Sequence, residues 1–294
     1  ITLNGIDFIG HASRETTDLD GLVASEFILC KNVSFRGCTF DGFNKNIELT
    51  SCENVLILNN SVTNAIETAN ATNGYGVLLE SGSNIVIDNN NISVERHCVY
   101  INESENVFVT NNILTGQTDD KSTYSHYEGN VKIDGATNVL IDNNIITGNY
   151  YGVAFLNGFS EDKQYGAKKC IITNNLISNA IANSGFARGL ITCAEETDIY
   201  DVTIDNNILS FNTQVITVRG IDISYGRWHN LVIRNNILKN CYVGVRYAVE
   251  CNMVISDNLA IDCNTGYDMS NGSYHASGNY NYYTNCIRLV FRTL

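Results

Sequence analysis

Proline is missing from this chain of 294 residues, so its turns must come from other residues, chiefly Gly and Asn. No apolar run approaches 18 residues, and we therefore expect no insertion into a membrane. Basic residues are also few, because 18 Lys and Arg stand against 31 Asp and Glu, which gives a net charge of −13. A chain this acidic is not expected to bind nucleic acid or an anionic membrane, since both attract basic surfaces.

The ten cysteines include no CxxC pair, which argues against a zinc site. Several lie among apolar residues, where a free cysteine behaves as a small hydrophobic side chain. We therefore expect reduced thiols, as in proteins made in a reducing cytosol. No metal or other cofactor is predicted, with a divalent cation such as calcium left open.

An asparagine pair recurs along the chain, always after an alternating apolar run, as in "NVLIDNNIITG" at residues 138–148. The steps between successive pairs range from 22 to 32 residues, and 22 is the shortest step. The repeat is therefore a unit of about 22 residues, lengthened by insertions in some copies. The first asparagines of the pairs are Asn59, Asn89, Asn111, Asn143, Asn174, Asn206 and Asn235, and Gly37 and Asp257 extend the series.

A second alternating run follows about ten residues after the pair where no insertion intervenes. Alternation predicts strands with one buried face, and a repeat of short strands without helical periodicity predicts a β-solenoid. In stacked coils the asparagines form a column, in which each buried amide bonds the next and the left-handed corner is tolerated. The inward residues of this run are predicted to begin at Ile47, Val77, Val99, Val131, Val153, Leu190, Ile221 and Val245.

The pattern N-V-x-I-x-N-N-x-I, followed by G-V-x-x, resembles the right-handed parallel β-helix of the pectin-lyase-like superfamily. The resemblance extends from about Phe8 to Asn279 and implies an all-β, single-stranded parallel β-helix of about ten rungs with an asparagine ladder. We interpret residues 1–294 as one β-helix domain cut from a longer protein. In this superfamily the outer face of the "GV" strand commonly lines a carbohydrate groove.

Outward positions of the "GV" strands supply the candidate site. One column contains Glu48, Leu78, Tyr100, Lys132, Ala154, Ile191, Asp222 and Arg246, and the next contains Thr50, Glu80, Asn102, Asp134, Leu156, Cys193, Ser224 and Ala248. The motifs of polygalacturonases, mannuronan epimerases and pectate lyases are absent. The catalytic candidates are therefore the polar outward residues Glu80, Tyr100, Lys132 and Asp134. The substrate-binding candidates are Arg96, His97, Asn102, His126, Tyr127, Glu128, Asp222 and Arg246.

Two chemistries fit these residues. Glu80 and Asp134 are two rungs apart, or about 9.6 Å between backbones, close to the separation of about 6.5–9.5 Å in inverting glycosidases. Elimination from a uronic acid would instead need a base such as Lys132, Tyr100 or His97 and a cation such as Arg96. Hydrolysis is favoured, because carboxylates outnumber bases in this acidic chain.

The sequence therefore predicts a β-helix that binds and cleaves a cell-surface or capsular polysaccharide. Bare Asn-rich rungs and cysteines of cytosolic type resemble the tail-spike proteins of bacteriophages, which implies a virion-tail or extracellular location and a homotrimer. Two alternatives stay open: a non-catalytic receptor-binding or structural β-helix of a phage tail, and a secreted polysaccharide lyase.

Overall fold

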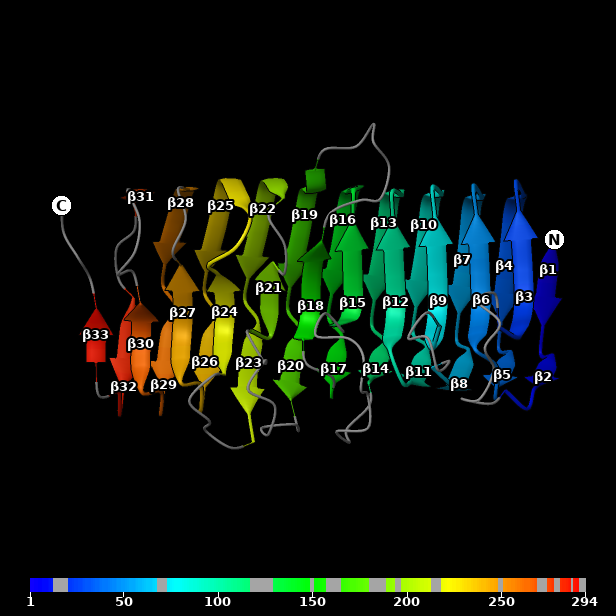
Figure 1. Cartoon of the computed structure of the whole chain (residues 1–294), viewed down its shortest axis with the longest axis horizontal. Coiled ribbons are helices and arrows are strands. Elements are labelled where there is room, and N and C mark those ends of the chain that lie inside the picture. The colour runs from blue at the N-terminus through cyan, green and yellow to red at the C-terminus, as the bar shows by residue number, and fades with distance from the viewer. Residues whose placement is uncertain are drawn as a thin grey trace.

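The computed structural model describes residues 1–12, 21–67, 73–116, 129–148, 151–156, 165–179, 189–193, 197–212, 218–247, 251–268, 274–277, 281–286 and 288–290. These residues form a right-handed parallel β-helix with three sheets of eleven strands each, which confirms the predicted fold and the expectation of about ten rungs. The rungs stack along one axis, with β1 at one end and β33 at the other (Figure 1). Within this described part, no helix is long and apolar enough to cross a membrane.

We name the sheets A, B and C in the order in which the chain visits them. Sheet A contains β1 (Thr2–Asn4), β4 (Lys31–Arg36), β7 (Glu53–Leu58), β10 (Ser83–Asp88), β13 (Glu105–Thr110), β16 (Ala136–Asp142), β19 (Tyr165–Thr173), β22 (Asp198–Asp205), β25 (Arg227–Arg234), β28 (Cys251–Ser256) and β31 (Tyr274–Ser277). Sheet B contains β2 (Asp7–Ile9), β5 (Thr39–Asp41), β8 (Ser61–Ala65), β11 (Asn91–Val94), β14 (Ile113–Thr115), β17 (Ile145–Thr147), β20 (Leu176–Asn179), β23 (Ile208–Phe211), β26 (Ile237–Lys239), β29 (Leu259–Ile261) and β32 (Tyr282–Thr284).

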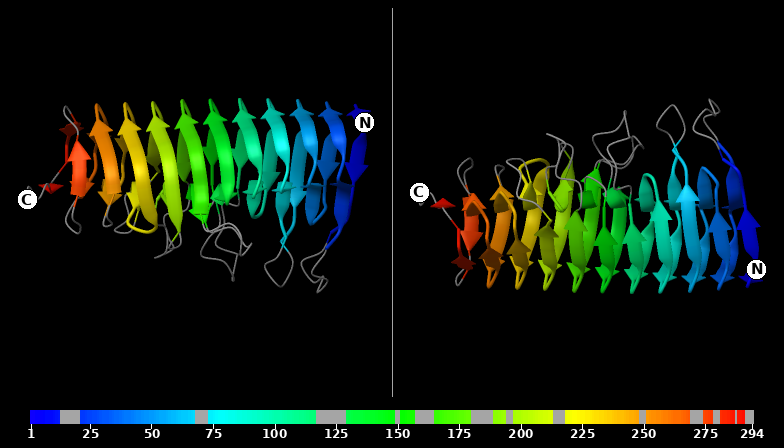
Figure 2. Two further views of the ribbon diagram at one scale, coloured as in Figure 1. Left: turned by 90° about the horizontal axis from the view of Figure 1, so that it is seen from above. Right: turned by 90° about the horizontal axis from the view of Figure 1, so that it is seen from below.

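Sheet C is formed by the "GV" strands. It contains β3 (Val23–Ile28), β6 (Lys45–Thr50), β9 (Tyr75–Glu80), β12 (His97–Asn102), β15 (Gly129–Asp134), β18 (Tyr151–Leu156), β21 (Ile191–Cys193), β24 (Arg219–Ile223), β27 (Val243–Tyr247), β30 (Thr265–Asp268) and β33 (Arg288–Val290). Views from above and from below, each perpendicular to that of Figure 1, show the same regular stacking of rungs along the axis (Figure 2). This regularity keeps equivalent residues of neighbouring rungs in straight columns.

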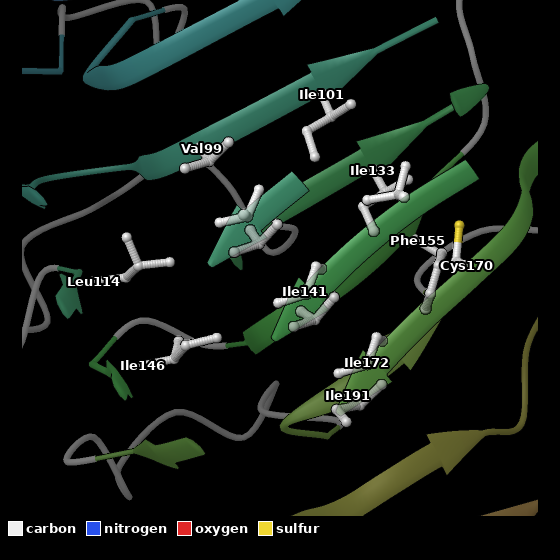
Figure 3. Packing of buried hydrophobic residues seen from close by; sticks show 14 of the residues in the cluster. Val99, Ile101, Leu114, Ile133, Ile141, Ile146, Phe155, Cys170, Ile172 and Ile191 are labelled. Atoms are coloured by element: carbon white, nitrogen blue, oxygen red, sulfur yellow. The ribbon is translucent and has the colours of Figure 1, made fainter. Parts of the chain in front are cut away.

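The core is a single column of apolar side chains enclosed by the three sheets. Alternate residues of each strand point inward, so Ile101 of sheet C, Ile141 of sheet A and Ile146 of sheet B all contribute to the one core inside the coil (Figure 3). All three are fully buried. At about 25 cal/mol per Å² of apolar surface removed from water, such columns supply most of the stabilisation of the fold.

The asparagine ladder is formed by the second member of each pair, at the corner between sheets A and B. Asn144 Oδ1 accepts hydrogen bonds from the backbone N and the Nδ2 of Asn112, at 2.9 and 3.0 Å. Asn144 in turn donates to Asn175 Oδ1 and to the carbonyl of Val109. The column begins at Cys38, whose backbone N donates to Asn60 Oδ1, and it continues through Asn60, Asn90, Asn112, Asn144, Asn175, Asn207, Asn236, Asn258 and Asn281.

The first asparagine of each pair has a different role, which the sequence did not separate from that of the second. Asn143 is exposed and has φ = 54°, so it makes the left-handed corner that exposes one residue and buries the next. Its side chain still bonds Asn111 along the surface, at 2.8 Å. The expectation that both asparagines of a pair are buried is therefore wrong for the first.

The predicted register is correct in most of sheet C and wrong at β21. Val153 pairs with Ile191 and Ala154 with Thr192, so Thr192 lies in an outward column and Ile191 in an inward one. Cys193 likewise packs in the core instead of facing outward. A shift of one residue moves every side chain to the other face. Leu190 and Ile191 are both apolar, so the sequence is compatible with either residue pointing inward. In the structure Ile191 points inward, and the hydroxyl of the neighbouring Thr192 lies within hydrogen-bond distance of the carbonyl oxygens of Cys193 and Asp222.

Candidate functional site on sheet C

The outer face of β9, β12 and β15 gathers the predicted catalytic residues. Asn102 pairs with Glu80 on one side and with Asp134 on the other, so these three residues form one column. Tyr100 pairs with Lys132 in the neighbouring column. Parallel strands keep this alignment because their hydrogen bonds fix equivalent residues side by side.

Asp134 is the centre of the cluster. The Tyr100 hydroxyl donates a hydrogen bond to Asp134 Oδ2 at 2.7 Å, and Lys132 Nζ lies 3.2 Å from the same oxygen. Lys132 Nζ also lies 4.2 Å from the centre of the Tyr100 ring, within the range of a cation–π contact. The Asp134 side chain is fully buried, and a buried carboxylate requires such partners.

Burial raises the pKa of the Tyr100 phenol far above its usual value of 10. The negative charge of Asp134 and the hydrogen bond to it act in the same direction. Tyr100 therefore keeps its proton at neutral pH, where it is a hydrogen-bond donor to Asp134 and not a base.

His97 is the neutral group of the cluster. Burial lowers its pKa well below the usual 6.5, and the nearby positive charges of Arg96 and Lys132 lower it further. Its Nδ1 lies 2.8 Å from the carbonyl oxygen of Gly129, which can only accept, so the proton resides on Nδ1 and Nε2 carries a lone pair. Nε2 is buried and has no hydrogen-bond partner among the residues that the structure describes.

Aromatic contacts hold these groups in place. The Tyr75 ring stacks on His97 at 5.4 Å between centres, and Tyr100 meets both rings edge-on at 5.8 and 5.6 Å. Arg96 donates from Nη1 to the Tyr75 hydroxyl at 3.0 Å. A neutral imidazole, a protonated phenol and two cations are therefore brought together on one face.

This face is covered, whereas the sequence predicts an open groove. Tyr100 is 6% exposed, Lys132 9% and Asp134 0%. Tyr100 packs with Tyr75 and Leu78 in a small apolar cluster outside the main core. The outward side chains of this part of sheet C therefore form a second packed layer, in which Glu80 and Asn102 are the half-exposed members.

Other predicted residues lie apart from this cluster. Asp222 is buried on β24, three strands beyond β15, where it pairs with Arg219 and accepts from Ser224 Oγ at 2.6 Å. Arg246 lies on the next strand, with its Nε 4.0 Å from a carboxyl oxygen of Asp268. His126, Tyr127 and Glu128 lie outside the described residues.

A group of carboxylates precedes the cluster on sheet C. Thr50 Oγ1 lies 3.4 Å from Glu80 Oε2, and Lys45 Nζ lies 2.9 Å from Glu48 Oε1. Burial raises the pKa of Glu48, the contact with Lys45 opposes that rise, and the charges of Glu26 and Glu80 add to it. Within the described parts of the chain, no group of three or more His, Cys, Asp or Glu side chains could hold a metal ion.

The sequence reasoning missed Tyr75, Arg219 and the pairing of Lys45 with Glu48. Tyr75, Arg219 and Lys45 lie two residues before the first inward residue of their strands, at the position that His97 occupies in β12. Extending the alternation one step toward the start of each strand would have found all three.

Comparisons with known proteins agree with this architecture. Residues 25–187, more than half of the chain, match the family model described as "Right handed beta helix region", and the chain belongs to this family. No curated protein matches the chain by sequence.

Solved structures with a similar fold come from proteins of different functions. The surface adhesin PfbA of Streptococcus pneumoniae has 16% identity and a TM-score of 0.61, over 98% of this chain and 78% of that one. A hyperthermoactive exopolygalacturonase of Thermotoga maritima has 13% identity and a TM-score of 0.57, over 88% and 82% of the two chains. The Dettilon tailspike protein has 13% identity and a TM-score of 0.55, over 96% and 61%. At these identities the likeness concerns the fold.

Proposed function

We propose that this protein binds an extracellular polysaccharide on the outer face of sheet C and cleaves it by β-elimination at a uronic acid residue. One observation carries this proposal: neutral His97 and protonated Tyr100 lie side by side, 5.6 Å between ring centres, next to Lys132. Environments that push two pKa values apart are characteristic of an acid and base pair.

The roles follow from the protonation states. His97 Nε2 removes the proton from the carbon next to the uronate carboxyl group, and the electron pair of that C–H bond forms the new double bond. The glycosidic bond breaks, and its oxygen leaves with a proton from Tyr100. Lys132 and Arg96 stabilise the negative charge that develops on the carboxyl group. No further reactant is consumed.

Asp134 orients the Tyr100 hydroxyl in this scheme, through the hydrogen bond of 2.7 Å. Because His97 and Tyr100 are nearly buried, a sugar reaches them only when the outer layer of sheet C opens. The exopolygalacturonase among the structural neighbours supports a polysaccharide as the ligand. The adhesin and the tailspike support a place at a cell surface or on a virion tail.

Hydrolysis by Glu80 and Asp134 is the second candidate function. The observation in its favour is the straight column Glu80–Asn102–Asp134, which separates the two carboxyl-bearing residues by two strand spacings. Against it, Asp134 Oδ2 already engages the Tyr100 hydroxyl and Lys132 Nζ, so that oxygen is not available to a water molecule or to a glycosidic oxygen. Elimination is favoured for that reason.

The test is end-group analysis after incubation with uronate-containing and neutral polysaccharides. Elimination gives products that absorb in the ultraviolet because they carry an unsaturated uronate, and hydrolysis gives new reducing ends without that absorbance. H97Q and Y100F should each lower the rate of elimination about 100-fold or more. Y200F is a matched control, because Tyr200 stacks on His229 on sheet A, away from this site.

Each outcome decides between the candidates. Reducing ends without unsaturation, lost in E80Q and D134N, would establish hydrolysis in place of elimination. Tight binding with no new ends of either kind would establish the non-catalytic, receptor-binding alternative. Unsaturated products that H97Q and Y100F leave undiminished would show that elimination occurs elsewhere on the chain.

A further inference from the structure

An apolar stripe runs along the outer face of sheet B. In sheet B, the first residue of each strand from β14 onward points outward, and in the first four of these strands it is Ile113, Ile145, Leu176 and Ile208, all exposed. These side chains are 48%, 44%, 41% and 43% exposed. Direct pairing continues the stripe through Ile237, Leu259 and Tyr282. Sheet B forms the row of short strands along the lower part of Figure 1.

The stripe is also free of acidic residues. The second outward column of the same strands contains Thr115, Thr147, Ser178, Ser210, Lys239, Ile261 and Thr284. These fourteen positions therefore include one base and no acid, in a chain whose net charge is −13. A neutral, apolar face on such an acidic protein indicates a surface that is covered by a partner.

The fold itself does not require these apolar residues. The same first position is Thr39 in β5, Ser61 in β8 and Asn91 in β11, and these strands pair in the same way. Threonine favours strands as much as isoleucine does, so strand propensity would be met without exposing apolar surface. The change from polar to apolar side chains at β14 is therefore not explained by the folding of the coil, and it indicates an interaction with another molecule.

We propose that the stripe is a self-association surface, on which the sheet B of another copy of this chain packs. Two chains with a charge of −13 repel each other, and this repulsion is smallest where the contacting faces carry no acidic groups, a condition that this face meets. A basic partner would gain nothing here, because the stripe offers no negative charge. A second copy also presents rows with the same spacing of about 4.8 Å, into which the side chains interdigitate.

The size of the face sets the strength of this association. Six spacings of about 4.8 Å and strands of three residues give a face of about 29 by 10 Å. This face of about 290 Å² is roughly a third of the 800 Å² per partner that a specific interface of standard size buries, so it falls in the class of weak, transient contacts. The association is therefore expected to depend on concentration, and to strengthen with added salt, which screens the repulsion between the acidic chains.

Sedimentation velocity over a range of protein concentrations and at two salt concentrations tests this proposal. The wild-type chain should form dimers or trimers, and the triple variant I145T/L176T/I208T should weaken association about tenfold or more. I171T is the matched control, because Ile171 is 45% exposed on the outer face of sheet A. Circular dichroism and the melting temperature report whether each variant keeps the fold.

Three results would overturn the proposal. One is a wild-type chain that stays monomeric at every concentration and at high salt. Another is equal weakening by I171T and by the triple variant, which would locate the contact elsewhere. The third is unchanged association in a folded I145D/I208D variant, in which like charges on the stripe should prevent pairing.

Discussion

The Tyr100 hydroxyl donates a hydrogen bond of 2.7 Å to Asp134 across two neighbouring strands of sheet C. The two residues are 34 positions apart in the sequence, and the coil brings them into adjacent columns. Y100F removes this donor and leaves the ring in place. Because the acceptor is a fully buried carboxylate, the free energy of unfolding should fall by about 1.5–3 kcal/mol. Urea denaturation measures this loss, and a change below about 0.5 kcal/mol, the scatter typical of surface substitutions, would contradict it.

The pH dependence of stability should report on His97. Its folded pKa is depressed, so above pH 6.5 both folded and unfolded states hold the imidazole neutral and stability is unaffected. As the pH falls below 6.5, His97 binds a proton in the unfolded state but stays neutral in the folded state, so the free energy of unfolding decreases. The expected loss is up to about 1.4 kcal/mol per pH unit. H97Q should lack this part of the acid sensitivity, and parallel slopes for the two proteins in urea unfolding between about pH 7 and 5 would refute the assignment.

The two asparagines of one pair should differ sharply in what they contribute. N144A removes the acceptor of the Asn112 backbone N–H, one of the two acceptors of the Asn112 Nδ2, and the Nδ2 donor to the carbonyl of Val109, all in the buried ladder. At about 1–3 kcal/mol for each unmet group, the loss of stability should be about 3 kcal/mol or more. N143G is the control, because Asn143 is exposed and glycine adopts its positive φ without strain, so the change should stay below about 1 kcal/mol. Similar losses of stability for N144A and N143G in thermal or urea unfolding would show that the buried asparagine of the pair does not stabilise the fold more than the exposed one.

Glycine is required in β18 by close packing. A Cβ on Gly152 would approach the carbonyl oxygen of Leu190 to 2.8 Å and would also collide with the Cγ2 of Ile177. G152A should therefore cost about 1–3 kcal/mol through overpacking. G266A on β30 is the matched substitution, because its nearest neighbours would be Ala260 and Tyr283 at 3.5 and 3.6 Å, which are ordinary contacts. Equal melting temperatures for the two variants would contradict this explanation.

Much of the fold and part of the site were predictable because they depend on periodicity. The spacing of the asparagine pairs fixes the rung, and alternation assigns a face to each residue, so counting along the chain is enough to place Glu80, Asn102 and Asp134 in one column. The same counting failed at β21, where two adjacent apolar residues, Leu190 and Ile191, fit either register. Local pattern cannot choose between faces when both candidates are apolar.

The sequence by itself determined the coil, its ladder and the columns of its outer face, because these follow from short-range alternation repeated at a fixed interval. Only the tertiary structure decided that Tyr100, Lys132 and Asp134 touch and that the layer they form is buried. Burial and contact depend on what packs over a face, and it is burial that sets the opposite pKa shifts of His97 and Tyr100. The chemistry proposed for this site therefore rests on packing between rungs, which no single repeat encodes.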